Sequence, residues 1–108
     1  MNEPLMRQID VAGLRTALTT DAAPCRVVDV REVHEFVSGH VPGAVNVPLT
    51  QVVDRVREVT EAPGEVYLVC ESGGRSGQVA AGLGQQGYDV VNVAGGTAAW
   101  RASGFPVE

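Results

Sequence analysis

Cys70 is the residue of this chain whose surroundings most favour covalent chemistry. It ends an apolar run over residues 66–69 and precedes a short glycine-containing segment, after which a helical pattern begins. Backbone N–H groups in such a loop can turn inward as an anion-binding nest, and the positive end of the next helix points the same way. A cysteine held there shifts toward the thiolate, which is its nucleophilic form. The pattern therefore predicts a reactive Cys70 that needs neither a metal nor an organic cofactor.

The ordinary role of a cysteine in a valine-rich strand is packing, and for Cys70 this alternative stays open. Its place at the end of the strand, before polar residues and glycines, favours the reactive role. Cys25 follows a proline and leads into a strand with no glycine loop after it, so we expect it to be structural. The two cysteines have neither the spacing of a zinc site nor that of a CxxC dithiol, and no metal site is predicted.

The elements that must position Cys70 are short apolar runs alternating with helical patterns. This order is typical of βα units and of a parallel sheet covered on both faces. Strands are predicted at residues 26–30, 44–47, 66–70 and 90–93. Helices are predicted behind an Asp10 cap, through Val52, Val56 and Val59, and over residues 32–38, 75–86 and 97–102. Gly77, Gly82 and Gly84 inside the fourth of these helices are expected to allow close packing on the sheet.

Composition limits the kind of partner. The 108 residues suffice for one core, so we expect a single domain over residues 1–108. The 8 basic residues, all arginine, face 13 carboxylates and give a net charge of −5. This balance argues against binding to nucleic acid or to an anionic membrane surface. The chain has no apolar run long enough to span a membrane and no basic segment at its start, so we expect a cytoplasmic protein. Short exposed sheet edges and a moderate net charge permit a monomer, which is the expected state.

The chain resembles the rhodanese-like (sulfurtransferase) domain family in segments that follow the family's order. The first segment is Asp29-Val30-Arg31-Glu32 with Glu35-Phe36, and the second, residues 39–48, is similar to G-H-[IV]-x-G-A-x-N-[IV]-P. The third, Cys70-Glu71-Ser72-Gly73-Gly74-Arg75-Ser76, matches the active-site loop C-x-x-G-x-R-S. The closing segment comprises residues 87–90, Gly95-Gly96, Trp100 and residues 104–107.

The resemblance implies an α/β fold of the rhodanese-like type, with a mostly parallel five-stranded sheet, helices on both faces and an edge strand near residues 7–10. It also implies a double displacement. Cys70 would take the outer sulfur of a small donor such as thiosulfate, hold it as a persulfide and pass it to a thiophilic acceptor, which can be the thiol of a partner protein. The loop residues Glu71, Ser72, Gly73, Gly74, Arg75 and Ser76 would bind the substrate and stabilise the persulfide through inward N–H groups.

Charged residues beside the loop are expected to support it. Arg75 would pair with Asp29 or Glu35, or contact an anionic donor directly. Asp29 and Arg31 either hold the loop from behind or form a purely structural salt bridge. Glu71 would oppose the thiolate and repel thiosulfate unless it points to solvent or pairs with Arg75 or Arg31.

The spacing of the loop separates sulfur chemistry from phosphate chemistry. Dual-specificity phosphatases of related fold place an arginine six positions after the cysteine, whereas here the sixth residue is Ser76 and Arg75 comes fifth. This favours the sulfur-handling members. His40 lies in a turn with glycine and proline and is expected to fix this turn rather than act as a base. A different class stays open: a regulatory or protein-binding module, or a thiol redox sensor, without turnover.

Overall fold

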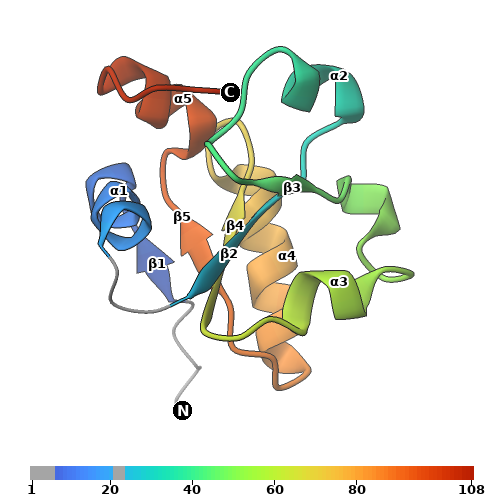
Figure 1. Ribbon diagram of the computed structural model, residues 1–108. Coiled ribbons are helices and arrows are strands. Elements are labelled where there is room, and N and C mark those ends of the chain that lie inside the picture. The colour runs from blue at the N-terminus through green and yellow to red at the C-terminus, as the bar shows by residue number, and fades with distance from the viewer. Residues whose placement is uncertain (1–6, 21–23) are drawn as a thin grey trace.

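The centre of the computed structural model is a sheet of five strands in the order β1-β5-β4-β2-β3 (Figure 1), and every pair of neighbours is parallel. The strands are β1 (Gln8–Ile9), β2 (Cys25–Asp29), β3 (Val45–Asn46), β4 (Glu65–Val69) and β5 (Val91–Val93). The structure describes residues 7–20 and 24–108; residues 1–6, which carry the expectation about the start of the chain, lie outside it. The predicted five-stranded α/β fold is confirmed, including the edge strand β1.

Helices cover both faces of the sheet. They are α1 (Val11–Thr19), α2 (Val33–Val37), the 3-10 helix η1 (Leu49–Gln51), α3 (Val56–Thr60), α4 (Gly74–Gln85) and α5 (Gly96–Ala102). On one face α1 and α5 place the fully buried Leu14 and Trp100 in one core cluster (Figure 1). On the other face α3 and α4 place Val59 and Leu83 in a second cluster. Neighbouring residues of β2 and β4 alternate between the two clusters, which is why these strands are apolar throughout most of their length.

Two helix starts follow from local hydrogen bonds. The side chain of Asp10 accepts the backbone N–H of Gly13 at 2.8 Å, so the predicted cap of α1 is confirmed. At α2 the side chain of Glu35 accepts the backbone N–H of Glu32 at 2.9 Å in a capping box. The second cap fixes the position of Glu35, whose carboxylate also reaches the Cys70 loop.

The single helix predicted through Val52, Val56 and Val59 is wrong in part. The 3-10 helix η1 ends before Val52, and α3 begins only at Val56. Arg55, between them, has φ −117° and ψ 29°, outside the helical region. Val52 and Val59 are still buried in the same cluster, because each short segment turns its own valine toward the sheet.

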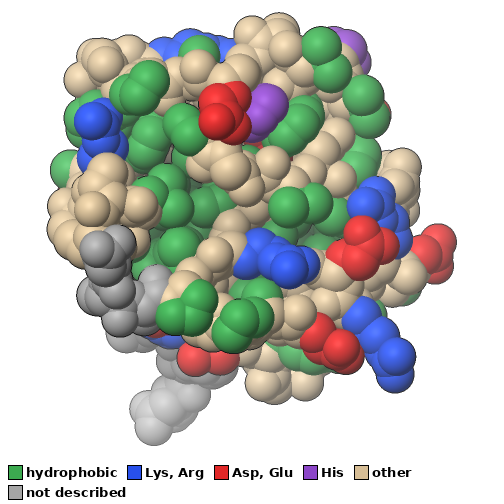
Figure 2. Space-filling view, in the orientation of Figure 1, with side chains coloured by type: hydrophobic (Ala, Val, Ile, Leu, Met, Phe, Trp, Pro, Cys, Tyr) green, Lys and Arg blue, Asp and Glu red, His purple; other side chains and the backbone are tan. Residues whose placement is uncertain are grey.

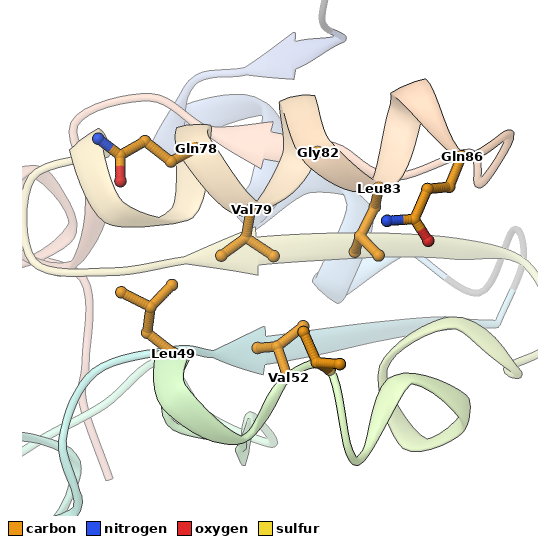
Figure 3. Close-up of a pocket in the computed structure, with 8 residues that line it drawn as sticks. Leu49, Val52, Gln78, Val79, Gly82, Leu83 and Gln86 are labelled. Carbon is orange, nitrogen blue, oxygen red and sulfur yellow. The ribbon is translucent and has the colours of Figure 1, made fainter.

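Close packing on the sheet does not explain Gly82 and Gly84. A Cβ added at either position would meet no atom within 4 Å, so this prediction is wrong for both. Gly82 instead lines a groove between α4 and the η1 segment. Figure 3 shows Leu49 and Val52 pointing across this groove toward Val79 and Leu83 of α4. The lining contains no residue of the Cys70 loop.

The surface carries both signs of charge. On the face shown in Figure 2, acidic and basic side chains are interspersed among hydrophobic and neutral ones. Within residues 7–20 and 24–108, no helix combines the length and apolar character that crossing a membrane requires.

Candidate active site

Cys70 lies at the carboxyl end of β4, the middle strand of the sheet, and its side chain is 1% exposed. Ligands of open α/β sheets gather at this edge. The loop after Cys70 is short because Gly73 takes a left-handed conformation, with φ 101°, and α4 begins at the next residue. Only glycine adopts this conformation freely. The chain therefore turns from strand to helix within a few residues of the sulfur.

The loop turns hydrogen-bond donors toward the sulfur. The backbone N–H of Gly73 donates to Cys70 Sγ at 3.1 Å, and Ser76 Oγ lies 3.3 Å from Sγ. Burial by itself raises the pKa of the thiol, but hydrogen bonds from the Ser76 hydroxyl and from the backbone N–H groups of Ser76, Gly73 and Ser72 outweigh it. They hold the pKa of Cys70 below its ordinary value, which favours the thiolate.

Helix α5 holds the outer side of the loop. The carbonyl oxygens of Cys70 and Glu71 accept the backbone N–H groups of Thr97 and Ala98, both at 2.9 Å. The carbonyl of Glu71 and the N–H of Ser72 belong to one planar peptide unit and point in opposite directions. Because α5 draws this carbonyl outward, the Ser72 N–H faces the sulfur.

Gly96 permits this contact and was not predicted to do so. Its φ is 61°, and a Cβ there would lie 2.6 Å from the carbonyl carbon and oxygen of Glu71. It would lie even closer to the carbonyl oxygen of Cys70. In the sequence, Gly95-Gly96 contributed only to the family resemblance. The signal was available, since paired glycines between a strand and a helix often mark a close backbone approach.

Asn92 is the second residue that the sequence analysis missed. It lies in β5, is 2% exposed, and its Oδ1 is 2.6 Å from Ser76 Oγ. Its Nδ2 faces Gln8 Oε1 at 3.2 Å and the carbonyl oxygen of Gly73 at 3.4 Å. One amide thus joins the edge strand, the loop and the start of α4. Its signal is a lone polar residue inside an apolar strand, which must have a buried partner.

Arg75 is paired with Glu35 at the rim of the loop. Two parallel hydrogen bonds, of 2.9 and 3.0 Å, join the guanidinium to the carboxylate. These bonds, opposed by burial and aided by the backbone N–H of Glu32, lower the pKa of Glu35 to about 2. Of the two predicted partners of Arg75, Glu35 is the one that the structure brings to it.

Asp29, the other predicted partner, binds Arg31 instead. Both side chains are buried, and the salt bridge between them is 2.8 Å long. Arg31 Nη1 also donates to Glu71 Oε1 at 3.1 Å, so this pair holds the loop as well as the end of β2. The second oxygen of Glu71 lies 3.5 Å from Arg101 Nη1. The carboxylate next to Cys70 is therefore drawn to two guanidinium groups.

His40 is occupied by its own turn. Its Nδ1 lies 2.9 Å from the carbonyl oxygen of Phe36, and its ring stacks on the Phe36 ring with centroids 3.7 Å apart. This geometry agrees with the expected role in fixing the turn. Among the described residues, no group of three His, Cys, Asp or Glu side chains is arranged to hold a metal ion.

Comparisons with known proteins identify the family to which this site belongs. The sequence model of the rhodanese-like domain family matches residues 12–103. A sulfurtransferase of Allochromatium vinosum is 35% identical over 104 residues, which cover 95% of each chain. The thiosulfate sulfurtransferase GlpE of Pseudomonas putida is 39% identical over 84 residues, covering 76% of this chain and 74% of that protein. The Bacillus subtilis protein YrkF is 33% identical over 92% of this chain, which spans only 53% of its length.

A solved structure agrees with these sequence matches. The rhodanese-related protein of Thermoplasma volcanium superimposes with a TM-score of 0.83 at 27% identity, over 94% of this chain and 97% of that one. The names of the two sulfurtransferase relatives support sulfurtransferase activity at the level of the family. The chain belongs to the rhodanese-like domain family.

Proposed function

We propose that this protein transfers sulfane sulfur through a persulfide on Cys70. In the first step the Cys70 thiolate attacks the outer sulfur of the donor. The Sγ–S bond forms while the S–S bond of the donor breaks, and its electron pair leaves with the remainder, which is sulfite when the donor is thiosulfate. In the second step a thiophilic acceptor attacks the terminal sulfur, the Sγ–S bond breaks and the thiolate is regenerated. Both steps are balanced displacements without a further oxidant or reductant.

The observation that carries this proposal is the ring of donors around Cys70 Sγ. The N–H of Gly73 and the hydroxyl of Ser76 lie within hydrogen-bond distance of the sulfur. A persulfide carries its negative charge on the terminal sulfur, next to the position that the thiolate occupies. The backbone N–H donors are fixed in place before the reaction, so they can stabilise either anion without reorganising. The same loop can thus serve both half-reactions.

The charges at the rim bear on the choice of donor. Arg75 is paired with Glu35, and the buried Arg31 is paired with Asp29. Glu71 faces both Arg31 and Arg101. A small dianion such as thiosulfate would therefore compete with carboxylates for every one of these guanidinium groups. We expect slow loading by thiosulfate and faster loading by a less charged donor, such as a low-molecular-weight or protein persulfide.

Intact-mass spectrometry tests the proposal. Wild type, Cys70→Ser and Cys25→Ser are incubated with thiosulfate and, separately, with glutathione persulfide, and cyanide is then added. Wild type and Cys25→Ser should gain one sulfur atom that cyanide removes, and Cys70→Ser should gain none. A cyanide-labile sulfur that survives in Cys70→Ser would contradict the proposal. So would a wild type that no donor modifies.

Thiol redox sensing is the second candidate. The lowered pKa of Cys70 favours oxidation as well as sulfur transfer. The 1% exposure of Cys70 limits the access of an oxidant and of a sulfur donor alike, so the reagent that modifies Cys70 has to separate the two candidates. Reversible modification of Cys70 by peroxide, together with no sulfur gain from either donor, would replace the sulfurtransferase proposal with this one.

A further inference from the structure

Ser76 Oγ lies between two groups that can each accept its hydrogen. Cys70 Sγ is 3.3 Å away on one side, and Asn92 Oδ1 is 2.6 Å away on the other. Ser76 is fully buried and Asn92 is 2% exposed. A hydroxyl carries a single hydrogen, so it donates to one of these groups at a time. When the hydrogen points to Cys70, the sulfur faces a hydrogen-bond donor. When it points to Asn92, the sulfur faces a lone pair of Ser76 Oγ.

The orientation of the Asn92 amide settles the shorter contact. The carbonyl of Gly73 can only accept, and it lies 3.4 Å from Nδ2. Gln8 Oε1, another acceptor, lies 3.2 Å from Nδ2. Together they fix Nδ2 away from Ser76 and leave Oδ1 facing it. Because Oδ1 cannot donate, the 2.6 Å contact is a hydrogen bond donated by Ser76.

We propose that Asn92 is a positioning residue that holds the Ser76 hydrogen while Cys70 Sγ is uncharged and gives it up when Sγ becomes a thiolate. In the thiol, S–H donates to Ser76 Oγ, and Ser76 donates to Asn92. In the thiolate, the hydroxyl turns to the sulfur, and Asn92 Oδ1 loses its donor. Asn92 therefore raises the free energy of the thiolate relative to the thiol.

The persulfide extends this argument and rests on the proposed function. Its negative charge lies on the terminal sulfur, so Sγ no longer requires the hydroxyl. The Ser76 hydrogen then returns to Asn92. The exchange favours sulfur loading of Cys70. A thiolate that competes with Asn92 for the Ser76 hydrogen has a higher free energy, so its conversion to a persulfide becomes more favourable.

Within the described part of the chain, no charged side chain forms a hydrogen bond with the sulfur. The charged side chains around the loop, which lie in β2, the segment after it, α2, α4, α5 and the loop itself, are paired with one another; they are Asp29, Arg31, Glu35, Arg75, Arg101 and Glu71. Among the described residues, the side-chain hydrogen bond to Sγ comes from Ser76. The Ser76–Asn92 contact is thus the side-chain link through which the thiol can be tuned without changing a charge.

The test is a pH titration of the Cys70 thiolate by its ultraviolet absorbance, in a Cys25→Ser background. Asn92→Ala and Asn92→Leu remove the acceptor, and Leu keeps most of the side-chain volume. Each should lower the pKa of Cys70 by about one unit, a tenfold larger acid dissociation constant. In a Ser76→Ala background the same Asn92 substitutions should leave the pKa unchanged, because the effect passes through the hydroxyl.

Gln8→Ala provides a variant that does not disturb the core. Gln8 is exposed, and its loss weakens the hold on Nδ2, so the pKa of Cys70 should fall in the same direction by a smaller amount. An unchanged or raised pKa in the Asn92 variants that remain folded by circular dichroism would overturn the inference. An equal fall in the Ser76→Ala background would also overturn it. The titration uses no sulfur donor, so its failure is distinct from a failure of the sulfurtransferase proposal, which the mass measurement reports.

Discussion

Thr97 donates two hydrogen bonds to the carbonyl oxygen of Cys70, through its backbone N–H at 2.9 Å and its hydroxyl at 3.2 Å. Thr97 is fully buried in the first turn of α5, so these bonds are shielded from water. The backbone of Cys70 is thereby fixed by a helix that follows a different strand, β5. Together with the bond from the Ala98 N–H to the Glu71 carbonyl oxygen, this contact fixes the first two peptide units of the loop.

Gly96→Ala should break this contact and strongly destabilise the fold. Gly96 has φ 61°, and an added Cβ would lie 2.6 Å from the Glu71 carbonyl group. The strained φ and the backbone overlap together should lower the free energy of unfolding by about 3 to 5 kcal/mol. Urea denaturation followed by circular dichroism measures this loss.

Gly104→Ala is the matched control for Gly96→Ala. Gly104 also has a positive φ, 78°, but an added Cβ there meets no atom within 4 Å. We expect a loss of only about 1 kcal/mol, from the backbone conformation alone. Equal losses in the two variants would show that the approach of α5 to the loop is not tight.

Gly82→Ala should stabilise the protein. Gly82 lies within α4, and its missing side chain leaves open space in the groove beside Val79. Alanine in a helix interior should raise the free energy of unfolding by about 0.5 to 1 kcal/mol. The measurement is the midpoint of urea denaturation, with sulfur loading of Cys70 as the check that the loop is unchanged. A lower midpoint would mean that the groove closes on Gly82 in solution.

The fold and the position of Cys70 were predictable from local patterns. Valine runs separated by turns indicated buried parallel strands, and the structure moves their bounds by about one residue. The edge strand β1 has two residues, too few to show a pattern, and came only from the resemblance. The break before α3 was missed because Val52 and Val59 keep a helical spacing and a common burial even though no single helix joins them.

The partners of the loop were not predictable from spacing. Asn92 and Thr97 reach the loop from β5 and α5, which lie beside β4 only because the strand order is β1-β5-β4-β2-β3. Local sequence does not encode this order. The same holds for Arg75, for which two carboxylates at the end of β2 and in α2 were equally plausible until their positions were known.

The ion pair of Glu35 and Arg75 should make the free energy of unfolding depend on pH in the acid range. The pKa of Glu35 is about 2 in the fold, against an ordinary value of 4.5. A carboxyl group with a lower pKa in the fold stabilises it fully above its unfolded pKa, and this contribution disappears as the pH falls from 4.5 toward 2. Because the pair is partly exposed, we expect a contribution of about 1 to 2 kcal/mol at neutral pH.

Urea denaturation at stepwise lower pH checks this dependence. Glu35→Gln should lose the contribution at neutral pH and show a shallower fall in stability through the acid range. Arg75→Gln should remove the same part of the pH dependence, since the pair needs both members. A wild-type slope in either variant would show that the ion pair does not stabilise the fold.

Glu71→Gln should increase the rate at which thiosulfate loads Cys70. Glu71 occupies Arg31 at 3.1 Å and Arg101 at 3.5 Å, and its charge repels an anionic donor. Removing the charge frees part of both guanidinium groups, so loading should become about 3- to 10-fold faster and more sensitive to salt.

The control is Glu61→Gln, which changes the net charge equally but lies at the end of α3, outside the loop, and should leave the rate unchanged. Loading by glutathione persulfide should respond less to Glu71→Gln than loading by thiosulfate does, because the persulfide group brings one negative charge to the loop and thiosulfate brings two. If thiosulfate loads Glu71→Gln no faster than Glu61→Gln, the charge of Glu71 does not limit the rate of loading. The preference for a less charged donor must then be abandoned.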